Sequence, residues 1–220
     1  MQSIFKRKPG QFTQKNRNSL ALHQDWGNQC HSDNIHILRM PLDGKRLFTG
    51  SWDRHLKEWN PTDRTLIHDW GIVHNSDMWH MEIAKDDESM FTVGYDKHLK
   101  RWSISQRALI KDFGQIHDMF INRVTISPNM KYVFTGGATE DRSLKIWDMR
   151  TSELVTNFPK VHGKCIAAMK ATSDNKMLFT GSEDYTVKQF CLKRKRLFFD
   201  WGNIHDNWID CLDLSEDDKL

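Results

Sequence analysis

The chain has 220 residues, of which 38% are apolar, and a formal net charge of +3 at pH 7 with charges of both signs spread along it. A chain of this size can bury a substantial core, and its mixed charge argues against a global attraction to nucleic acid or membranes. No apolar run approaches the ~20 residues of a membrane span, and the first twenty residues lack the apolar region of a secretory signal.

The N-terminal residues 1–19 are polar and include Lys6-Arg7-Lys8 followed by a proline. We interpret them as a disordered or loosely attached tail. The segment from Ser19 to Gly27 matches the segment from Thr65 to Gly71. It is therefore predicted to be an isolated fourth strand that arrives before any first strand, at the start of an array covering residues 20–220.

From residue 31 onward one set of landmarks recurs: a His, an alternating apolar run, Phe-Thr-Gly or a close variant, an Asp, and an aromatic residue. The landmark histidines are separated by 43, 43, 45 and 43 residues, and a fifth copy has only begun at His205. The sets are His31, Thr49, Asp53 and Trp59; His74, Thr92, Asp96 and Trp102; His117, Thr135, Asp141 and Trp147; and His162, Thr180, Asp184 and Phe190. A fixed period of this size indicates a repeat architecture.

Each period reads as four short strands. Apolar residues alternate in the first, as in Val124 and Ile126, and turn residues such as Ser127-Pro128-Asn129 follow. The predicted modules lie at about 35–67, 78–110, 121–155 and 166–198. One such sheet cannot bury both of its faces alone, so its sequence neighbours must cover it, as in a propeller blade. We therefore predict an all-β propeller with four complete blades.

The last copy begins at residue 205, and Trp208 to Leu214 is predicted to form one more first strand. The sequence stops before the next Phe-Thr-Gly is due, so the ring is expected to be incomplete and the chain to be a piece of a longer protein. A short self-contained ring, or one completed by a second chain, is the alternative. An unclosed array exposes apolar faces and strand edges, which favour self-association or a partner chain.

These landmarks resemble those of the WD40 repeat family over residues 20–220. The Trp-Asp dipeptide is intact at Trp147-Asp148 and altered in the other copies. The resemblance implies a hydrogen-bonded network in each blade, in which the Asp bonds the His, the His reaches the Thr hydroxyl, and the Thr reaches the Trp indole N–H. In the fourth set Phe190 has no N–H to donate, so this network is expected to lack one bond.

The resemblance also implies a non-catalytic scaffold that presents a rigid surface to a protein or peptide. The residue before each turn Asp is expected at the rim of the channel on the binding face, as is the residue three positions after each landmark His. The candidate partner-binding residues are Trp52, Tyr95, Glu140, Glu183, Asp77, Phe120 and Trp208. Aromatic residues are favoured as interface anchors, which puts Trp52 and Tyr95 first. An exposed turn aromatic without any partner is the competing interpretation.

Other functions have weaker support. Whole periods separate the histidines, so they are not expected to share a metal, and no nucleotide-binding or hydrolase motif occurs. We predict no enzyme activity and no cofactor. The basic run Lys193 to Arg196 could bind nucleic acid or acidic lipid, but a solvated hairpin is favoured; a purely structural array in a larger protein is a third alternative. The four cysteines lack Cys-x-x-Cys spacing, which favours reduced thiols and a cytoplasmic location, or a nuclear one.

Overall fold

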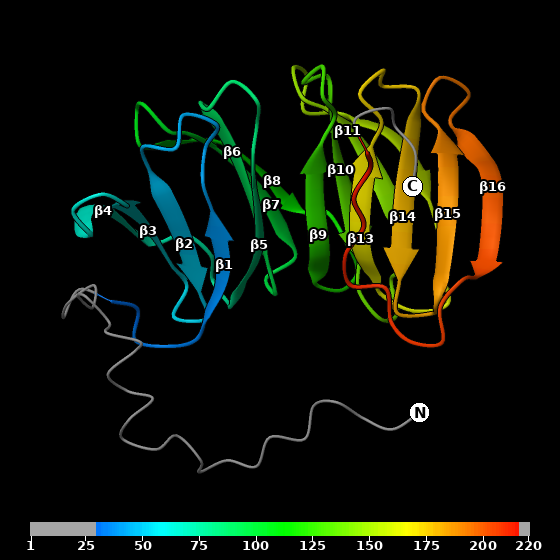
Figure 1. Cartoon of the computed structure of the whole chain (residues 1–220), viewed down its shortest axis with the longest axis horizontal. Coiled ribbons are helices and arrows are strands. Elements are labelled where there is room, and N and C mark those ends of the chain that lie inside the picture. The colour runs from blue at the N-terminus through cyan, green and yellow to red at the C-terminus, as the bar shows by residue number, and fades with distance from the viewer. Residues whose placement is uncertain (1–29, 216–220) are drawn as a thin grey trace, which may run out of the picture. The chain divides into compact units, whose positions relative to one another are not determined.

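The computed structural model describes residues 30–215, and within this range the chain is all-β. Its sixteen strands form four separate four-stranded antiparallel sheets, each paired in chain order. The prediction of an all-β propeller array is confirmed, and the four sheets do not close into a ring (Figure 1). Within the described range there is no helix with the length and apolar character needed to cross a membrane. The predicted tail and isolated strand at 19–27 lie outside the described residues.

We call the sheets blades 1 to 4. Blade 1 comprises β1 (Ile35–Arg39), β2 (Leu47–Ser51), β3 (His55–Asn60) and β4 (Thr65–Ile72). Blade 2 comprises β5 (Met78–Ile83), β6 (Ser89–Gly94), β7 (His98–Ser103) and β8 (Ala108–Gln115). Blade 3 comprises β9 (Ile121–Ile126), β10 (Tyr132–Gly137), β11 (Leu144–Asp148) and β12 (Leu154–Phe158). Blade 4 comprises β13 (Ile166–Ala171), β14 (Met177–Ser182), β15 (Thr186–Cys191) and β16 (Arg196–Asn203).

The landmark Asp shapes the turn between the second and third strands. In blade 1, Asp53 Oδ1 accepts the backbone N–H of His55 at 2.9 Å, and the intervening Arg54 has a φ of 72°. Aspartate side chains favour such turns because they hydrogen-bond backbone two residues on. The same bond recurs in the other three blades, and the residue after the Asp has a positive φ in each.

The fourth strand of three blades carries an Asp-aromatic-Gly sequence. In blade 1, Asp69 Oδ1 accepts the N–H of Gly71 at 2.8 Å, and Gly71 has a φ of 72°, a conformation that favours glycine. Blades 2 and 4 repeat this arrangement. In blade 3 the sequence is Asn157-Phe158-Pro159, and β12 ends at Phe158. The motif therefore lets the fourth strand continue past a bend.

The glycine of Phe-Thr-Gly allows neighbouring blades to approach closely. A Cβ atom on Gly50 would lie 2.7 Å from Met78 Sδ, in the first strand of the next blade. A Cβ on Gly136 would lie 2.9 Å from Ile166, the equivalent residue of blade 4. Both separations are too short for ordinary contact. The first strands lie side by side from blade to blade, and the hydrophobic core is divided among the blade interfaces.

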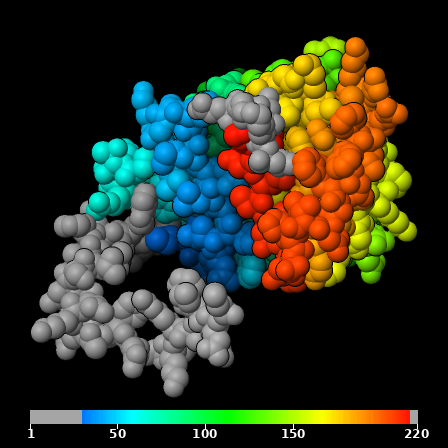
Figure 2. Space-filling view, turned by 45° about the vertical axis from the view of Figure 1, so that its right-hand side comes forward, coloured from blue at the N-terminus to red at the C-terminus, as the bar shows by residue number. Residues whose placement is uncertain are grey.

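Residues 208–214 do not form the predicted strand. Ile209, Leu212 and Leu214 pack against Phe179 and its neighbours in blade 4, so the segment covers that blade without a ladder (Figure 2). The prediction was wrong because a first strand is held by a second strand of its own blade, and no such strand follows among the described residues. A backbone bond from Ile209 N–H to Ser182 O, at 3.2 Å, joins it to the sheet.

Candidate functional site

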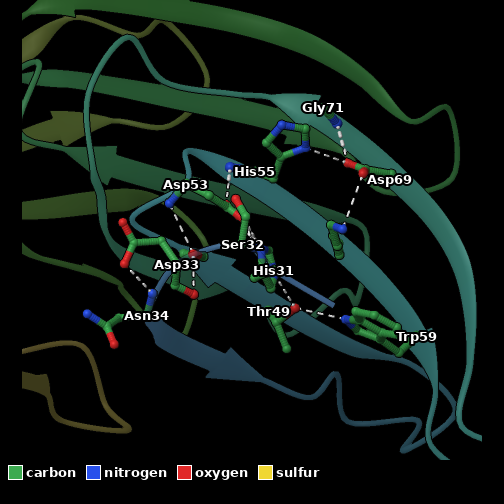
Figure 3. A network of polar contacts seen from close by, with 12 residues as sticks. His31, Ser32, Asp33, Asn34, Thr49, Asp53, His55, Trp59, Asp69 and Gly71 are labelled. Atoms are coloured by element: carbon green, nitrogen blue, oxygen red, sulfur yellow. Dashed lines mark hydrogen bonds and ion pairs between the residues drawn. The ribbon is translucent and has the colours of Figure 1, made fainter. Parts of the chain in front are cut away.

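The predicted network residues of blade 1 are in contact at the end of the blade that carries the landmark loop. His31 Nδ1 lies 2.9 Å from Asp53 Oδ2, and His31 Nε2 lies 2.8 Å from Thr49 Oγ1. The indole N–H of Trp59 donates to the same Thr49 oxygen at 2.8 Å (Figure 3). The four side chains thus form one continuous chain of hydrogen bonds that joins the loop before β1 and the β2–β3 turn to strands β2 and β3. We call the end of each blade that carries this loop and turn the network end.

Blades 2 and 3 contain the same arrangement. His117 contacts Asp141 Oδ2 and Thr135 Oγ1, each at 2.8 Å, and Trp147 donates to Thr135 at 3.1 Å. In blade 2 the matching distances are 2.9 Å from His74 to Asp96, 2.8 Å from His74 to Thr92, and 2.9 Å from Trp102 to Thr92. The side chains of His74 and His117 are buried, so these bonds stabilise the interior of single blades.

Blade 4 retains only part of the network. His162 contacts Thr180 Oγ1 at 2.8 Å and Asp184 Oδ2 at 3.2 Å. Phe190, at the position of the indole, is buried and packs on Phe158 with ring centroids 5.1 Å apart. The hydroxyl of Thr186 adds a contact to His162 Nδ1 at 3.0 Å. Apolar packing is therefore kept, while Thr180 has no indole donor in this blade.

In blades 1 and 3 the electrostatics of the network favour neutral histidine beside ionised aspartate. Burial lowers the pKa of His31 and of His117, although the neighbouring carboxylates act in the opposite direction. Burial opposes ionisation of Asp96, but hydrogen bonds from His74 and from two backbone N–H groups outweigh it and lower the pKa to about 2. The same balance lowers the pKa of Asp141 and Asp184. No group of three metal-ligating side chains occurs among residues 30–215.

A second repeated polar contact was not anticipated from the sequence. The ring of His55 lies 3.0 Å from Asp69 Oδ1, and His98 lies 2.8 Å from Asp112. A third-strand lysine lies near the aspartate of each pair, Lys57 in blade 1 and Lys100 in blade 2. Blade 4 has Thr186 at the position of the histidine and keeps only the lysine contact, in which Lys188 donates to Asp200 at 2.5 Å. The Asp-aromatic-Gly repeat could have revealed this contact, because the same aspartate anchors both the bend and the third strand.

Aromatic side chains from three blades gather at the network end. Trp52 and Trp79 are nearly parallel, with planes 4° apart and ring centroids separated by 6.4 Å. Tyr95 and Phe120 stack at 4.2 Å, and Trp79 meets Tyr95 edge-on at 5.0 Å. His36 completes the group, with its ring centroid 4.4 Å from that of Trp79. We call these five side chains the aromatic cluster.

Two members of this cluster, Trp79 and His36, were missed by sequence reasoning. Both occupy the second position of a first strand, where the ladder shifts register: Met78 pairs with Gly94 and His80 with Val93, leaving Trp79 between them. The equivalent residue of blade 3, Asn122, accepts the Trp79 indole N–H at 2.5 Å and donates to Ile166 O at 2.8 Å. This position therefore connects blades 1 to 4 through successive side chains.

Two of the predicted acidic candidates, Asp77 and Glu183, affect the ionisation of Tyr95 and Cys165 respectively. Asp77 O accepts the backbone N–H of Tyr95 at 3.0 Å, and its carboxylate helps to raise the pKa of the Tyr95 hydroxyl, for which burial is the largest cause and Cys165 contributes as well. Burial is also the largest cause of the raised pKa of Cys165, which Glu183 reinforces by its charge and a hydrogen bond. Asp77 thus acts on Tyr95, a member of the cluster, whereas Glu183 acts on Cys165, which is not.

The other candidates are separate from these contacts. Glu140 is exposed in the longer turn of blade 3. Trp208 is 55% exposed and makes no ring contact within the described residues. The basic run Lys193 to Arg196 forms the exposed turn between β15 and β16, at the opposite end of blade 4 from the network.

A polar cavity lies among the first strands. It is lined by residues that include Arg39, His80, Glu82 and Arg123. Arg39 donates to His80 Nε2 at 2.8 Å and lies 3.5 Å from Glu82. Burial lowers the pKa of Arg123, as does the charge of Arg39, while Asp210 and Glu183 act against this. The cavity beside the first strands is therefore charged, whereas the cluster at the network end of the blades is aromatic.

Comparison with known proteins agrees with this architecture. The chain matches the family described as WD domain, G-beta repeat, at residues 27–60, 110–148 and 152–191, which together make up more than half of its length. Blade 2 lies largely outside the matched segments but has the same four strands and the same network. A comparison with curated proteins found no match. The repeated network, the blade topology and the family match lead to one conclusion: the chain belongs to the WD40 repeat family.

Proposed function

We propose that this chain is a non-catalytic platform that binds a protein or peptide at the aromatic cluster. WD40 repeats generally act as protein-interaction scaffolds, which supports the class of function. The observation that carries the proposal is the gathering of five rings from three blades at one end of the array. Aromatic residues supply much of the binding energy of protein interfaces, where they act as rigid anchors.

The state of Trp52 supports a binding role. Its indole Nε1 is buried and has no hydrogen-bond partner within the described part of the chain. A buried donor that lacks a partner costs about 1–3 kcal/mol, a cost that an acceptor from a bound peptide would remove. Tyr95 belongs to blade 2 and contacts Trp79, which in turn contacts Trp52. It is 39% exposed and so is accessible to the same partner.

The test is selection of peptides from a random library on the intact chain, followed by binding measurements on variants. Trp79→Ala is expected to weaken the selected peptides at least tenfold, because Trp79 contacts Trp52, Tyr95 and Phe120. Phe198→Ala is the matched control, since Phe198 is an exposed aromatic residue on β16 outside the cluster. Equal loss in both variants, or selection of no peptide by a folded chain, would refute the proposal.

A second surface favours association with another propeller blade. In blade 1, Ile35 and Leu38 are 54% and 58% exposed, whereas the equivalent Met78 and Met81 of blade 2 are fully buried against blade 1. We infer that the Ile35–Leu38 face contacts a further blade, because apolar faces of this kind mark interaction sites. Light scattering on the chain and on an Ile35→Lys, Leu38→Lys variant tests this: association should disappear in the variant.

A further inference from the structure

We infer that the hairpin between β15 and β16 binds an anionic lipid surface, with the basic run Lys193 to Arg196 against the headgroups and Phe198 at the level of the interface. This contact is separate from the proposed peptide site, because the hairpin lies at the opposite end of blade 4 from the network end (Figure 1). It follows from the charge of the turn, the exposure of the strand that follows it, and two departures from the repeat.

The turn of blade 4 carries a different charge from the equivalent turns of the other blades. In blades 1 to 3 the turn between the third and fourth strands holds one cation, with an acidic residue in the turn or in contact with it; the cations are Arg64, Arg107 and Arg150. In blade 4 the run 193–196 consists of four consecutive cations, all exposed, and none forms an ion pair with another described residue. The adjoining turn does not compensate them, since its Asp174 is paired with Lys176 at 2.8 Å.

The fold requires the shape of this turn but not its charge. Lys195 has a φ of 48°, and the equivalent Arg64, Arg107 and Ser152 have φ values of 63°, 49° and 63°. A serine therefore serves the backbone as well as a lysine does. Leu192 is buried at the interface with blade 3 and anchors the start of the turn. The four cations are thus presented on a fixed hairpin without a structural need for them.

Phe198 places an exposed ring directly after the cations. It is the extra residue of a bulge, because residues 197 and 199 pair with neighbouring residues of β15 and leave it unpaired. The equivalent bulge residues of the other blades are aliphatic: Ile67, Ile110 and Val155. Ile110 is 49% exposed although blade 3 follows it, and Phe198 is 53% exposed. Exposure at this position is therefore a property of the blade and does not depend on a missing neighbour.

Phe199 is the second departure from the repeat. The equivalent positions of the other blades hold polar residues, namely His68, Lys111 and Thr156. Phe199 is 52% exposed and meets Trp201 edge-on, with ring centroids 5.5 Å apart. Exposed rings beside a cluster of cations are the combination that binds membrane surfaces, since the cations are attracted to anionic headgroups and the rings enter the apolar boundary.

A lipid surface fits this patch better than single-stranded nucleic acid does. Proteins that bind single strands use rings on which successive bases stack along a charged groove. Phe198 makes no ring contact within the described residues, and the planes of Phe199 and Trp201 are 85° apart, so these rings offer no parallel platform. Burial in a membrane interface sets no such requirement, because each ring is removed from water independently.

Vesicle flotation with the intact chain tests the inference. Vesicles of phosphatidylcholine alone are compared with vesicles in which about one third of the lipid is phosphatidylserine. We expect partitioning onto the anionic vesicles to be about tenfold stronger or more, because each cation near such a surface adds attraction. Binding should be lost when the salt concentration is raised to about 0.5 M, where the charges are screened over a few ångströms.

Two pairs of variants locate the contact. A variant with glutamine at all four positions of the run 193–196 should lose about tenfold or more of the partitioning. Its control removes the same charge from exposed cations at the network end or on β8, and should bind as the unchanged chain does; its substitutions are Arg54→Gln, Lys111→Gln, Lys160→Gln and Lys164→Gln. Phe198→Ala should weaken binding severalfold, whereas Ile110→Ala, at the same bulge position of blade 2, should not.

Equal partitioning on neutral and anionic vesicles, or unchanged binding by the glutamine variant, would overturn the inference. Binding to polyuridine RNA without binding to vesicles would also overturn it and would assign the patch to nucleic acid. Equal effects of Phe198→Ala and Ile110→Ala would remove Phe198 from the contact and with it the proposed interfacial placement. Trp79→Ala should leave vesicle binding unchanged, so failure of this inference and failure of the proposed function are distinguishable.

Discussion

The networks and the aromatic cluster both contain histidine and tryptophan, but they differ in whether the buried polar atoms of these side chains have hydrogen-bond partners. In blade 3 the side chains of His117 and Asp141 are almost fully buried, and each polar atom of the network has a partner within its own blade. In the cluster, which spans three blades, Trp52 leaves a buried N–H without a partner in the described chain. Satisfied bonds within a blade stabilise the fold, whereas the unpartnered N–H of Trp52 makes no such contribution.

The largest effect is expected from breaking a complete network. His117→Ala leaves the buried Asp141 carboxylate and the Thr135 hydroxyl without their common partner, and should lower the free energy of unfolding by about 3 kcal/mol. Urea denaturation followed by tryptophan fluorescence measures this. His205→Ala is the matched control: His205 is the landmark histidine of the fifth copy, is exposed, and should change stability by less than about 0.5 kcal/mol.

The second-largest effect is expected from acid, which should destabilise the networks. The folded pKa of Asp96 is about 2, below its ordinary value, so its contribution is complete above pH ~4 and is lost as the pH falls towards 2. The shift corresponds to about 2 kcal/mol. The lowered pKa values of buried His31 and His117 act in the same direction, because the unfolded histidines take up protons first, near pH 6.5. Asp96→Asn should flatten the dependence of the urea midpoint on pH below 4; an unchanged slope would contradict this assignment.

The difference between blades 3 and 4 predicts a smaller, reciprocal pair of effects. Trp147→Phe removes the N–H donated to Thr135 and should cost about 1 kcal/mol. Phe190→Trp supplies the missing donor to Thr180 and should stabilise the fold by a comparable free energy, which would be seen as a higher melting temperature. The site can hold an indole, since Phe158 faces this position as Phe113 faces Trp147. A melting temperature that does not rise on Phe190→Trp would argue against the donor as the relevant difference.

The smallest effect on stability is expected in the cluster. Trp52→Ala removes an unpartnered N–H together with the ring contacts to His36 and Trp79, so these contributions oppose each other and the free energy of unfolding should change by less than about 1 kcal/mol. The same variant should lose the peptide binding proposed above. A loss of stability as large as that of His117→Ala would show that Trp52 belongs to the structural group after all.

The network residues could be predicted from the sequence more completely than the residues of the aromatic cluster. Landmark His, Thr, Asp and Trp recur at fixed spacing because each blade needs the same bonds. The resemblance of these landmarks to the WD40 family allowed His31, Thr49 and Trp59 to be placed together in advance. Trp79 could not be placed, since its position at the cluster depends on a register shift that leaves no mark in the sequence. The missing strand at 208–214 has a different cause: alternation indicates a strand, but pairing requires a second one.

The side-by-side order of the blades also has a kinetic consequence. Contacts between blades join residues about one repeat apart, as when Trp79 bonds Asn122 and Asn122 bonds Ile166. Closing such short loops costs little entropy compared with joining distant segments, so folding can start in one blade and spread to its neighbours. Blades 2 and 3, flanked on both sides, should exchange their amide protons most slowly, while the outer strands of blade 1 open first.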